Sequence, residues 1–297
     1  MSKYSTFAFI GGDRRQIYVI KGFAADGYTV NVLGIDSPEL AGRKNITVCD
    51  NAPQAVNNAD FIVLPIPYSS IINNENINTP LCEKSVKVSA LFSDETDLKG
   101  KLILAGKADE RLCAMAKLGG AEVIDYMNRE ELAVLNAIPT AEGAVKIAMD
   151  ELPVTLHGSK CLVTGFGRVS KILCRTLDGL GARVTVSVRK KSDLAYITAY
   201  GYKGVDINRP LPRSESYDVV FNTVPQLIVT DTMLRSLRKD CLIIDLASKP
   251  GGVDFDAARR MGRNVIWALS LPGKVAPLTA GNIIRDTINN IISEQGR

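Results

Sequence analysis

The sequence predicts an α/β protein with two Rossmann-like domains, each a doubly wound parallel sheet, and a cleft between the domains. Short apolar runs alternate along the chain with amphipathic segments of about 10–15 residues, the pattern of strands joined by helical crossovers. Strands that are apolar along their whole length fit a sheet covered by helices on both faces. The chain of 297 residues is long enough for two buried cores, and the alternation begins again near residue 160.

The first domain is expected at residues 1–130, as a flavodoxin-like or Rossmann-like fold. Its strands are predicted at residues 6–10, 29–33, 61–64, 101–105 and 122–125, and its helices at about 14–25 and 108–118. The turn Gly11-Gly12-Asp13 joins the first strand to the first helix, and no G-x-G-x-x-G sequence follows it.

The second domain is expected at residues 131–297, and it includes a connecting helix and the C-terminal helix. Residues 129–150 have helical periodicity, and Pro139 is expected to kink or break that helix. Strands are predicted at 160–164, 183–188, 219–223, 242–246 and 265–269, with helices at 168–180, 194–200 and about 280–293.

Composition and charge exclude several classes of protein. The net charge of +4 and the scattered basic residues argue against a nucleic-acid partner, and no apolar run reaches the roughly 18 residues of a membrane span. Six scattered cysteines without a C-x-x-C pair, together with a single histidine, argue against a metal site. The N-terminus lacks the features of a signal peptide, so a reduced, cytoplasmic setting fits best.

The sequence KCLVTGFGRVS at residues 160–170 predicts a dinucleotide site. Gly165 suits the tight turn after the strand, and Gly167 lets the backbone approach a pyrophosphate. Arg168 and Val169 begin a helix whose free N–H groups attract phosphate. Ser170 occupies the third position of the fingerprint, where glycine or alanine is usual, and is expected to loosen the packing of helix on strand without preventing binding.

The end of the next strand favours NADP over NAD. An NAD-specific domain places a carboxylate there, whereas this chain has Arg189 and Lys190, and its first carboxylate is Asp193. Arg189 can bind the 2′-phosphate with its planar fork, and Lys190 adds positive charge.

Two further loops follow strands of this domain and are expected to contact the cofactor. Ligands of open α/β sheets bind at the carboxyl ends of the strands. The contacts expected there are made by Asn222, Thr223, Pro225, Ala247 and Ser248.

The first domain is expected to bind an anionic substrate. Asp13 is a natural N-cap, whereas Arg14 and Arg15 place positive charge at the positive end of a helix dipole. An anionic ligand would relieve that conflict, although an exposed basic turn explains the same residues. Ser69 and Ser70 follow another strand and can supply hydroxyl groups to the same cleft.

Candidates for proton transfer are few. His157 precedes the first strand of the second domain, at the amino end of the sheet, and is interpreted as structural. Glu142 and Lys249 are the candidate catalytic residues, and Thr140 beside Glu142 is a candidate substrate contact.

The motifs taken together resemble the family of the dipicolinate synthase A subunit. The segments that carry the resemblance are GGDRRQ, NAIPTAEGAVKIAM, LHGSKCLVTGFGRVS, NTVP, IIDLASKPGGVDF and LSLPGKVAPLTAG. They run in matching order over nearly the whole chain. The resemblance implies an enzyme of sporulation, in the mother cell of a spore-forming bacterium, that oxidises dihydrodipicolinate to dipicolinate with NADP and a separate B subunit.

Three alternatives stay open. The chain can be a non-catalytic NADP-binding subunit that depends on the B subunit. It can be another NAD(P)-dependent oxidoreductase, of the shikimate or 2-hydroxyacid dehydrogenase type. The third is a hydrolase of the S-adenosylhomocysteine type. It would hold NAD, and the basic residues Arg189 and Lys190 disfavour that cofactor. The residues do not decide whether the chain forms a homo-oligomer.

Overall fold

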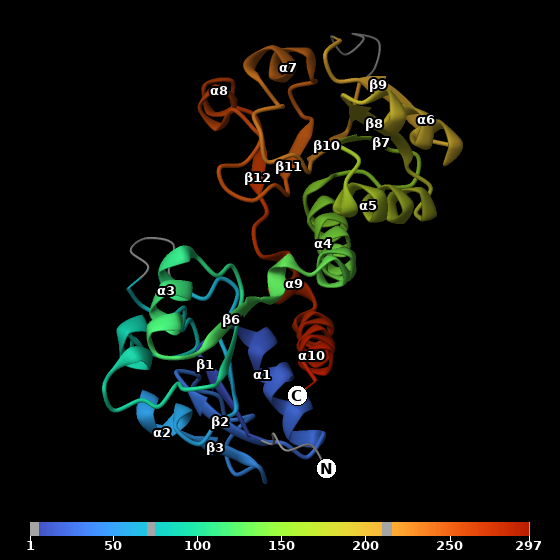
Figure 1. The fold of residues 1–297 in the computed structure, drawn as a ribbon. Coiled ribbons are helices and arrows are strands. Elements are labelled where there is room, and N and C mark those ends of the chain that lie inside the picture. The colour runs from blue at the N-terminus through green and yellow to red at the C-terminus, as the bar shows by residue number, and fades with distance from the viewer. Residues whose placement is uncertain (1–5, 70–74, 210–215, 297) are drawn as a thin grey trace. The chain divides into compact units, whose positions relative to one another are not determined.

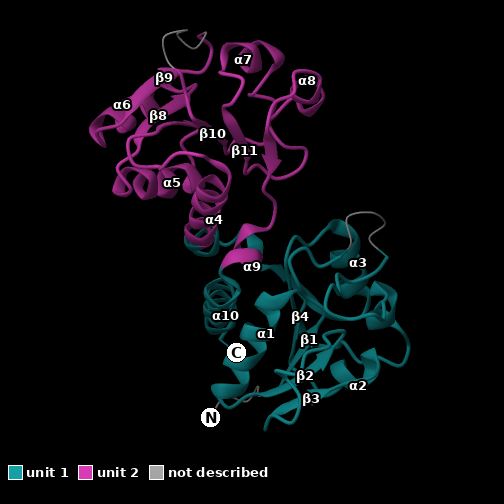
Figure 2. Cartoon of the chain, turned by 180° about the vertical axis from the view of Figure 1, so that it is seen from behind, with its two compact units in different colours: residues 1–135, 276–297 teal, residues 136–275 magenta. Residues whose placement is uncertain are grey.

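The structure, a computed structural model, describes residues 6–69, 75–209 and 216–296, and its chain forms two compact units. Unit 1 comprises residues 1–135 and 276–297, and unit 2 comprises residues 136–275 (Figure 2). Each unit is a six-stranded sheet in which every strand pairs in parallel with its neighbours. The predicted fold class of two Rossmann-like α/β domains is confirmed.

Unit 1 has the strand order β3-β2-β1-β4-β5-β6. Strands β1, β2, β3 and β6 are labelled in Figure 1. Its strands are β1 (Thr6–Ile10), β2 (Thr29–Leu33), β3 (Ile46–Val48), β4 (Phe61–Val63), β5 (Leu102–Ala105) and β6 (Glu122–Asp125). Its helices are α1 (Arg14–Ala25), α2 (Ala52–Val56), α3 (Glu110–Leu118) and α10 (Pro277–Glu294), with short 3-10 turns at Val88–Phe92 and Tyr126–Asn128.

Unit 2 repeats this topology with the order β12-β11-β10-β7-β8-β9. Its strands are β7 (Lys160–Thr164), β8 (Arg183–Val188), β9 (Lys203–Asp206), β10 (Val219–Asn222), β11 (Leu242–Asp245) and β12 (Val265–Trp267). Its helices are α5 (Arg168–Gly179), α6 (Lys191–Ala199), α7 (Asp231–Ser236), α8 (Phe255–Arg260) and α9 (Leu271–Val275). Helix α4 (Glu130–Glu151) begins in unit 1 and continues into unit 2.

In each sheet the chain adds strands first on one side of its first strand and then on the other side. In unit 1, β1 lies between β2 and β4, and in unit 2, β7 lies between β8 and β10. Ligands of open α/β sheets bind at the carboxyl ends of the strands at such a reversal. The loops after β1 and β4 in unit 1, and after β7, β8 and β10 in unit 2, are therefore the places to look for a site.

The C-terminal helix belongs to unit 1, and not to the second domain in which the sequence boundary at residue 131 had placed it. Ile284 and Ile288 of α10 are buried in the same apolar core as Ile17 and Phe23 of α1. At Gly281 the two helices come so close that a Cβ would lie 2.7 Å from the carbonyl oxygen of Arg15. The apolar face of α10 is thus covered by α1.

Pro139 does not break α4, so of the predicted kink or break the break is wrong. The helix runs unbroken for 22 residues with Pro139 inside it. Proline removes the hydrogen bond to the carbonyl four residues earlier, which here belongs to Leu135. Because Leu135 is exposed, water can take the place of the missing donor.

Helix α4 is long and apolar enough to cross a membrane by length and composition alone. Its most apolar 18-residue window is 44% buried inside the protein, and Leu132 and Ala141 of this helix belong to the apolar cores of units 1 and 2 respectively. A core helix of this kind passes the same test, so the finding is weak evidence for a membrane.

Candidate functional site

The glycine-rich turn between β7 and α5 has the backbone conformation that the dinucleotide fingerprint requires. Gly165 has a φ of +87°, and a Cβ there would lie 2.7 Å from Cγ2 of Val224 and 2.9 Å from Oγ1 of Thr223. A Cβ at Gly167 would meet nothing within 4 Å, so the start of α5 is open to a ligand. The turn therefore fits a phosphate group that approaches the N-terminus of α5.

Ser170 ties the start of α5 to the loop after β10 rather than loosening it. The side chain is fully buried, and its Oγ accepts a hydrogen bond from the backbone N–H of Gly167 at 3.1 Å. The same Oγ lies 3.0 Å from Oγ1 of Thr223, which donates to the carbonyl of Thr164 at 2.7 Å. Arg168 and Val169 form the first turn of the helix that this contact holds in place.

A buried polar cluster links the loops that follow β10 and β11. The carboxylate of Asp245 is fully buried and accepts hydrogen bonds from Nδ2 of Asn222 at 2.7 Å, from Ala247 N at 3.0 Å and from Gly252 N at 2.8 Å. Oδ1 of Asn222 accepts from the hydroxyl of Thr164 at 2.6 Å. Asn222 is itself completely buried, so its side chain positions the loops and does not make the direct ligand contact that the sequence suggested.

The other expected contacts in these loops differ in their exposure. Pro225 and Ser248 are exposed at the loop surfaces, whereas Ala247 is buried and its carbonyl accepts a hydrogen bond from the indole N–H of Trp267 at 2.9 Å. Thr223 is held by Thr164 and Ser170 as described. Only the exposed residues have side chains free to meet a ligand.

The basic residues that follow β8 line a cavity of about 250 Å³ at the carboxyl ends of the strands of unit 2. Arg189 and Lys190 lie on one side of this cavity, which reaches to Gly165 of the glycine-rich turn. Within the described ranges no carboxylate forms an ion pair with Arg189, which leaves its guanidinium available. Asp193 lines the same cavity, so the basic turn carries one negative charge that would face a 2′-phosphate.

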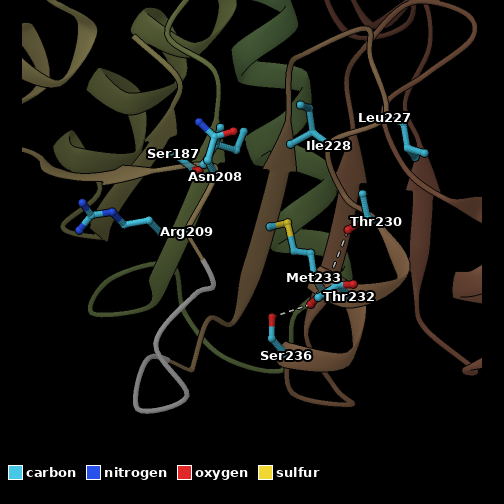
Figure 3. A pocket seen from close by; sticks show the side chains of 10 residues that line it. Ser187, Asn208, Arg209, Leu227, Ile228, Thr230, Thr232, Met233 and Ser236 are labelled. Carbon is cyan, nitrogen blue, oxygen red and sulfur yellow. Dashed lines mark hydrogen bonds between the residues drawn. The ribbon is translucent and has the colours of Figure 1, made fainter. Parts of the chain in front are cut away.

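A second cavity, of about 350 Å³, adjoins the first and shares Ser187, Ile207, Asn208 and Ile228 with it. Its lining comes from the end of β9 on one side and from α7 and the loop before it on the other (Figure 3). The two cavities form a continuous hollow beside the strand ends. Branched apolar side chains on its walls suit a flat aromatic ring such as adenine.

Replacing Asp193 by asparagine tests the electrostatics of this hollow. We expect NADP to bind a few-fold more tightly, because the substitution removes a negative charge near the 2′-phosphate, and NAD to bind no more tightly than before. Fluorescence titration of the two dinucleotides measures both affinities. Asp178→Asn is a matched control, since Asp178 is exposed near the end of α5 and lines neither cavity. Equal changes in the two variants would show that Asp193 does not face the cofactor.

The basic turn of unit 1 is arranged differently from what the sequence suggested. Asp13 is the N-cap of α1 as predicted, and its carboxylate accepts from the backbone N–H of Arg15 at 3.0 Å. The buried guanidinium of Arg15 donates twice to the same carboxylate, at 2.8 and 2.9 Å, and once to the carbonyl of Ile66 at 3.0 Å. The chain thus neutralises Arg15 by itself, and only Arg14 is exposed.

Two serines of unit 1, Ser69 and Ser70, were expected to contact the substrate. Ser69 is buried, with 4% of its surface exposed, and forms an isolated bridge with Ile77. Ser70 lies outside the described residues.

The candidate catalytic residues are not brought together. Glu142 is exposed on α4 and Lys249 is exposed in the loop after β11, and within the described part of the chain no hydrogen bond or ion pair joins them. The hydroxyl of Thr140 donates to the carbonyl of Asn136 within the helix, at 2.8 Å. His157 is exposed before β7 and packs against Gly181, at the amino end of the sheet, as the sequence indicated.

The buried cysteines of unit 2 are not suited to act as nucleophiles. Burial raises the pKa of Cys161 to about 11 and the pKa values of Cys174 and Cys241 to about 12. These thiols therefore stay protonated near neutral pH and pack as small apolar side chains.

Three residues of the site escaped sequence reasoning. Ile207 and Asn208 follow β9, a strand that was not predicted because Gly204 and two charged residues interrupt its pattern. The long unassigned stretch between the predicted helix that ends near residue 200 and the predicted strand that begins at residue 219 indicated that an element was missing there. Asp245 was missed because it ends an apolar strand and no nearby basic residue marks it.

The chain is similar to proteins of one family over its whole length. A family model described as the N-terminal domain of the dipicolinate synthase A subunit matches residues 6–127. The A subunit of dipicolinate synthase from Bacillus subtilis (strain 168) is 31% identical over 287 residues, which cover 97% of this chain and 95% of that protein.

Solved structures agree. The crystal structure of the A subunit of dipicolinate synthase from Bacillus halodurans matches with a TM-score of 0.86 and 31% identity, over 97% of each chain. That of the A chain from Bacillus subtilis has a TM-score of 0.86 at 30% identity, over 99% of this chain and 97% of the other. D-lactate dehydrogenase from Escherichia coli shares the fold, with a TM-score of 0.59 at 14% identity over 98% of each chain. The architecture is thus dehydrogenase-like.

Proposed function

Because the chain belongs to the family of the dipicolinate synthase A subunit, we propose that it oxidises dihydrodipicolinate to dipicolinate with NADP as the oxidant. The observation that carries the proposal is a similarity that covers 97% of the chain and so includes both units. The dehydrogenase-like fold and the glycine-rich turn support a nicotinamide cofactor.

The reaction removes one hydride and one proton from the ring, and its product is an aromatic pyridine. NADP, when bound, supplies the acceptor of the hydride. Aromatisation makes the oxidation strongly downhill, so the protein contributes mainly by holding the ring in the correct orientation. The released proton passes to water or to an exposed group, for which Glu142 and Lys249 are the candidates. A specialised base is not required, in keeping with the remote position of His157.

Unit 2 holds the cofactor in this proposal. The turn from Gly165 to Ser170 and the N-terminus of α5 bind the pyrophosphate, and Arg189 with Lys190 binds the 2′-phosphate. The hollow between Ile207 and Ile228 receives the adenine ring. The open surface at Gly167 supports these assignments, as does the guanidinium of Arg189, which forms no ion pair with the residues that the structure describes.

Unit 1 holds the substrate, a dianion whose oxidised product is planar, at the start of α1. The positive end of the helix dipole and the exposed Arg14 favour such a ligand. The family name indicates a second component, and we expect a B subunit to act with this chain in the cytoplasm of the mother cell during sporulation.

The proposal is tested with the purified full chain, dihydrodipicolinate and NADP. Reduced nicotinamide should accumulate faster than in a reaction without protein, and NAD should be the poorer oxidant. Parallel reactions contain either the B subunit by itself or both proteins together. If the absorbance of reduced nicotinamide grows at the spontaneous rate in every mixture, the proposed reaction is wrong.

A second candidate function is a non-catalytic cofactor-binding subunit. The observation that favours it is the absence of a conventional base near the strand ends of the described residues, since the buried thiols are protonated and His157 lies at the opposite end of the sheet. In that case the chain binds NADP by itself, but reduced nicotinamide forms only after the B subunit is added.

A further inference from the structure

The start of helix α1 holds an incomplete capping arrangement. Its sequence Asp13-Arg14-Arg15-Gln16 has the spacing of a capping box, in which the side chain at the third helical position accepts a hydrogen bond from the N–H of the capping residue. Asp13 performs its half, since its carboxylate accepts from the N–H of Arg15. Gln16 does not perform the other half: its side chain is 2% exposed, and its amide nitrogen has no hydrogen-bond partner.

In two other helices the side chain at the third helical position accepts a backbone N–H, from the N-cap residue in α5 and from the residue before the N-cap Asn51 in α2. In α5, which follows the corresponding strand of unit 2, Oγ of Ser170 accepts from the N–H of Gly167 at 3.1 Å. In α2, Oε1 of Gln54 accepts from the N–H of Asp50 at 2.9 Å. A glutamine at the third helical position therefore accepts a backbone N–H at the start of α2, whereas the glutamine at that position of α1 does not.

The open helix start leaves donors without acceptors. Within residues 6–69, 75–209 and 216–296, the backbone N–H groups of Asp13 and Arg14 have no hydrogen-bond acceptor. Asp13 is half-buried and Arg14 is exposed, so these N–H groups can donate to water or to a ligand that binds at the helix N-terminus.

The side chain of Gln16 is directed toward this set of donors. A Cβ built on Gly12 would lie 2.8, 2.9 and 3.3 Å from Cβ, Cγ and Cδ of Gln16. The side chain therefore runs back along the glycine that precedes the cap, toward the N-terminal end of the helix, as helical side chains do. The amide carbon of Gln16 thus lies beside Gly12, the residue before the N-cap.

The charges around the helix start favour an anion. The positive charge of Arg15 is compensated by Asp13, with 2.8 Å between Nη2 and Oδ2, and its remaining contact is the carbonyl of Ile66. The exposed guanidinium of Arg14 forms no ion pair with any described residue, although Glu39 lies near enough to interact with its charge, and the positive end of the helix dipole also attracts an anion. A carboxylate has two oxygens, each able to accept two hydrogen bonds, which matches two backbone donors and one amide.

We infer that the open start of α1 binds one carboxylate of the dianionic substrate, and that Gln16 is the side chain that selects it. The N–H groups of Asp13 and Arg14 and the amide of Gln16 donate to the carboxylate, and Arg14 adds long-range attraction. Arg15 has a structural role, since it holds Asp13 and the loop at Ile66. The inference rests on the proposed function for the identity of the ligand.

The test is Gln16→Glu in the full chain, with pyridine-2,6-dicarboxylate as the probe. A glutamate at this position completes the capping box by accepting the N–H of Asp13, so the variant should fold and melt at or above the wild-type temperature. Its charge takes the place of the ligand, so calorimetric titration should show binding at least tenfold weaker. Titrations are run with and without NADPH, whose own affinity should stay unchanged.

Two further variants sharpen the result. Gln54→Glu makes the same chemical change at the closed start of α2 and should bind the dicarboxylate like wild type. Gln16→Met removes the donor without adding charge; it should keep the melting temperature and raise the substrate KM while kcat stays within twofold.

The outcomes separate the inference from the proposed function. Undiminished dicarboxylate binding by both Gln16 variants, or no binding by wild type, overturns the carboxylate site. The proposed oxidation is judged separately, by reduced-nicotinamide formation in the wild-type protein.

Discussion

Replacement of Asp245 by alanine is expected to lower the free energy of unfolding of unit 2 by about 3–5 kcal/mol. The substitution removes a fully buried carboxylate and leaves three buried donors, Nδ2 of Asn222 and the N–H groups of Ala247 and Gly252, without their acceptor. Each unpaired buried group costs about 1–3 kcal/mol, and relaxation of the loops recovers part of the sum. Urea unfolding followed by circular dichroism measures the loss.

A matched control is Asp240→Ala. The carboxylate of Asp240 also pairs with a side chain, that of Arg238, but it is exposed, so its removal should have a far smaller effect. If both variants unfold at the same urea concentration, the cluster around Asp245 does not hold the two loops.

Replacement of Arg189 by alanine is expected to weaken NADP binding by about 10–100-fold and to change NAD binding less than about threefold. A hydrogen bond to a charged group contributes about 1.5–3 kcal/mol, and each 1.4 kcal/mol is a factor of ten. Arg189 lines the cavity at the end of β8, where the 2′-phosphate is proposed to bind. Equilibrium titration of both dinucleotides gives the two affinities.

Arg183→Ala provides the control for net charge. Arg183 is exposed at the beginning of the same strand, so this variant loses the same charge at the opposite edge of the sheet. NADP affinity should then stay close to wild type. Equal losses for NADP and NAD in Arg189→Ala would mean that this arginine does not distinguish the two cofactors.

Apolar strands and glycine turns made most of the fold predictable. The strand at Thr6–Ile10, helix α1 and the strand at Arg183–Val188 lie where the sequence placed them, because the two strands are buried almost throughout, α1 buries one face, and glycine marks the turns. The edge strand β3 was not predictable in this way, since it has only three residues and two of them are exposed.

The site was predictable where a single residue type imposes a conformation, as at Gly165. It was not predictable where function depends on which of several partners a polar side chain chooses. Arg15 offered a free charge to any ligand, yet it pairs with Asp13 two residues away. Asn222 suggested a ligand contact, yet its side chain donates a hydrogen bond to the carboxylate of Asp245, 23 positions further along the chain. Such choices follow from burial and three-dimensional proximity, which spacing alone does not reveal.

The packing of α10 on α1 makes unit 1 a discontinuous domain into which unit 2 is inserted. Unit 2 is contiguous at residues 136–275, whereas unit 1 needs both ends of the chain to complete its core. During synthesis unit 1 can therefore complete its core only after α10 has been translated, whereas every strand of unit 2 is already present by then. A ribosome that stops before residue 277 releases a chain whose inserted domain has all of its strands and whose N-terminal sheet lacks the helix that covers α1.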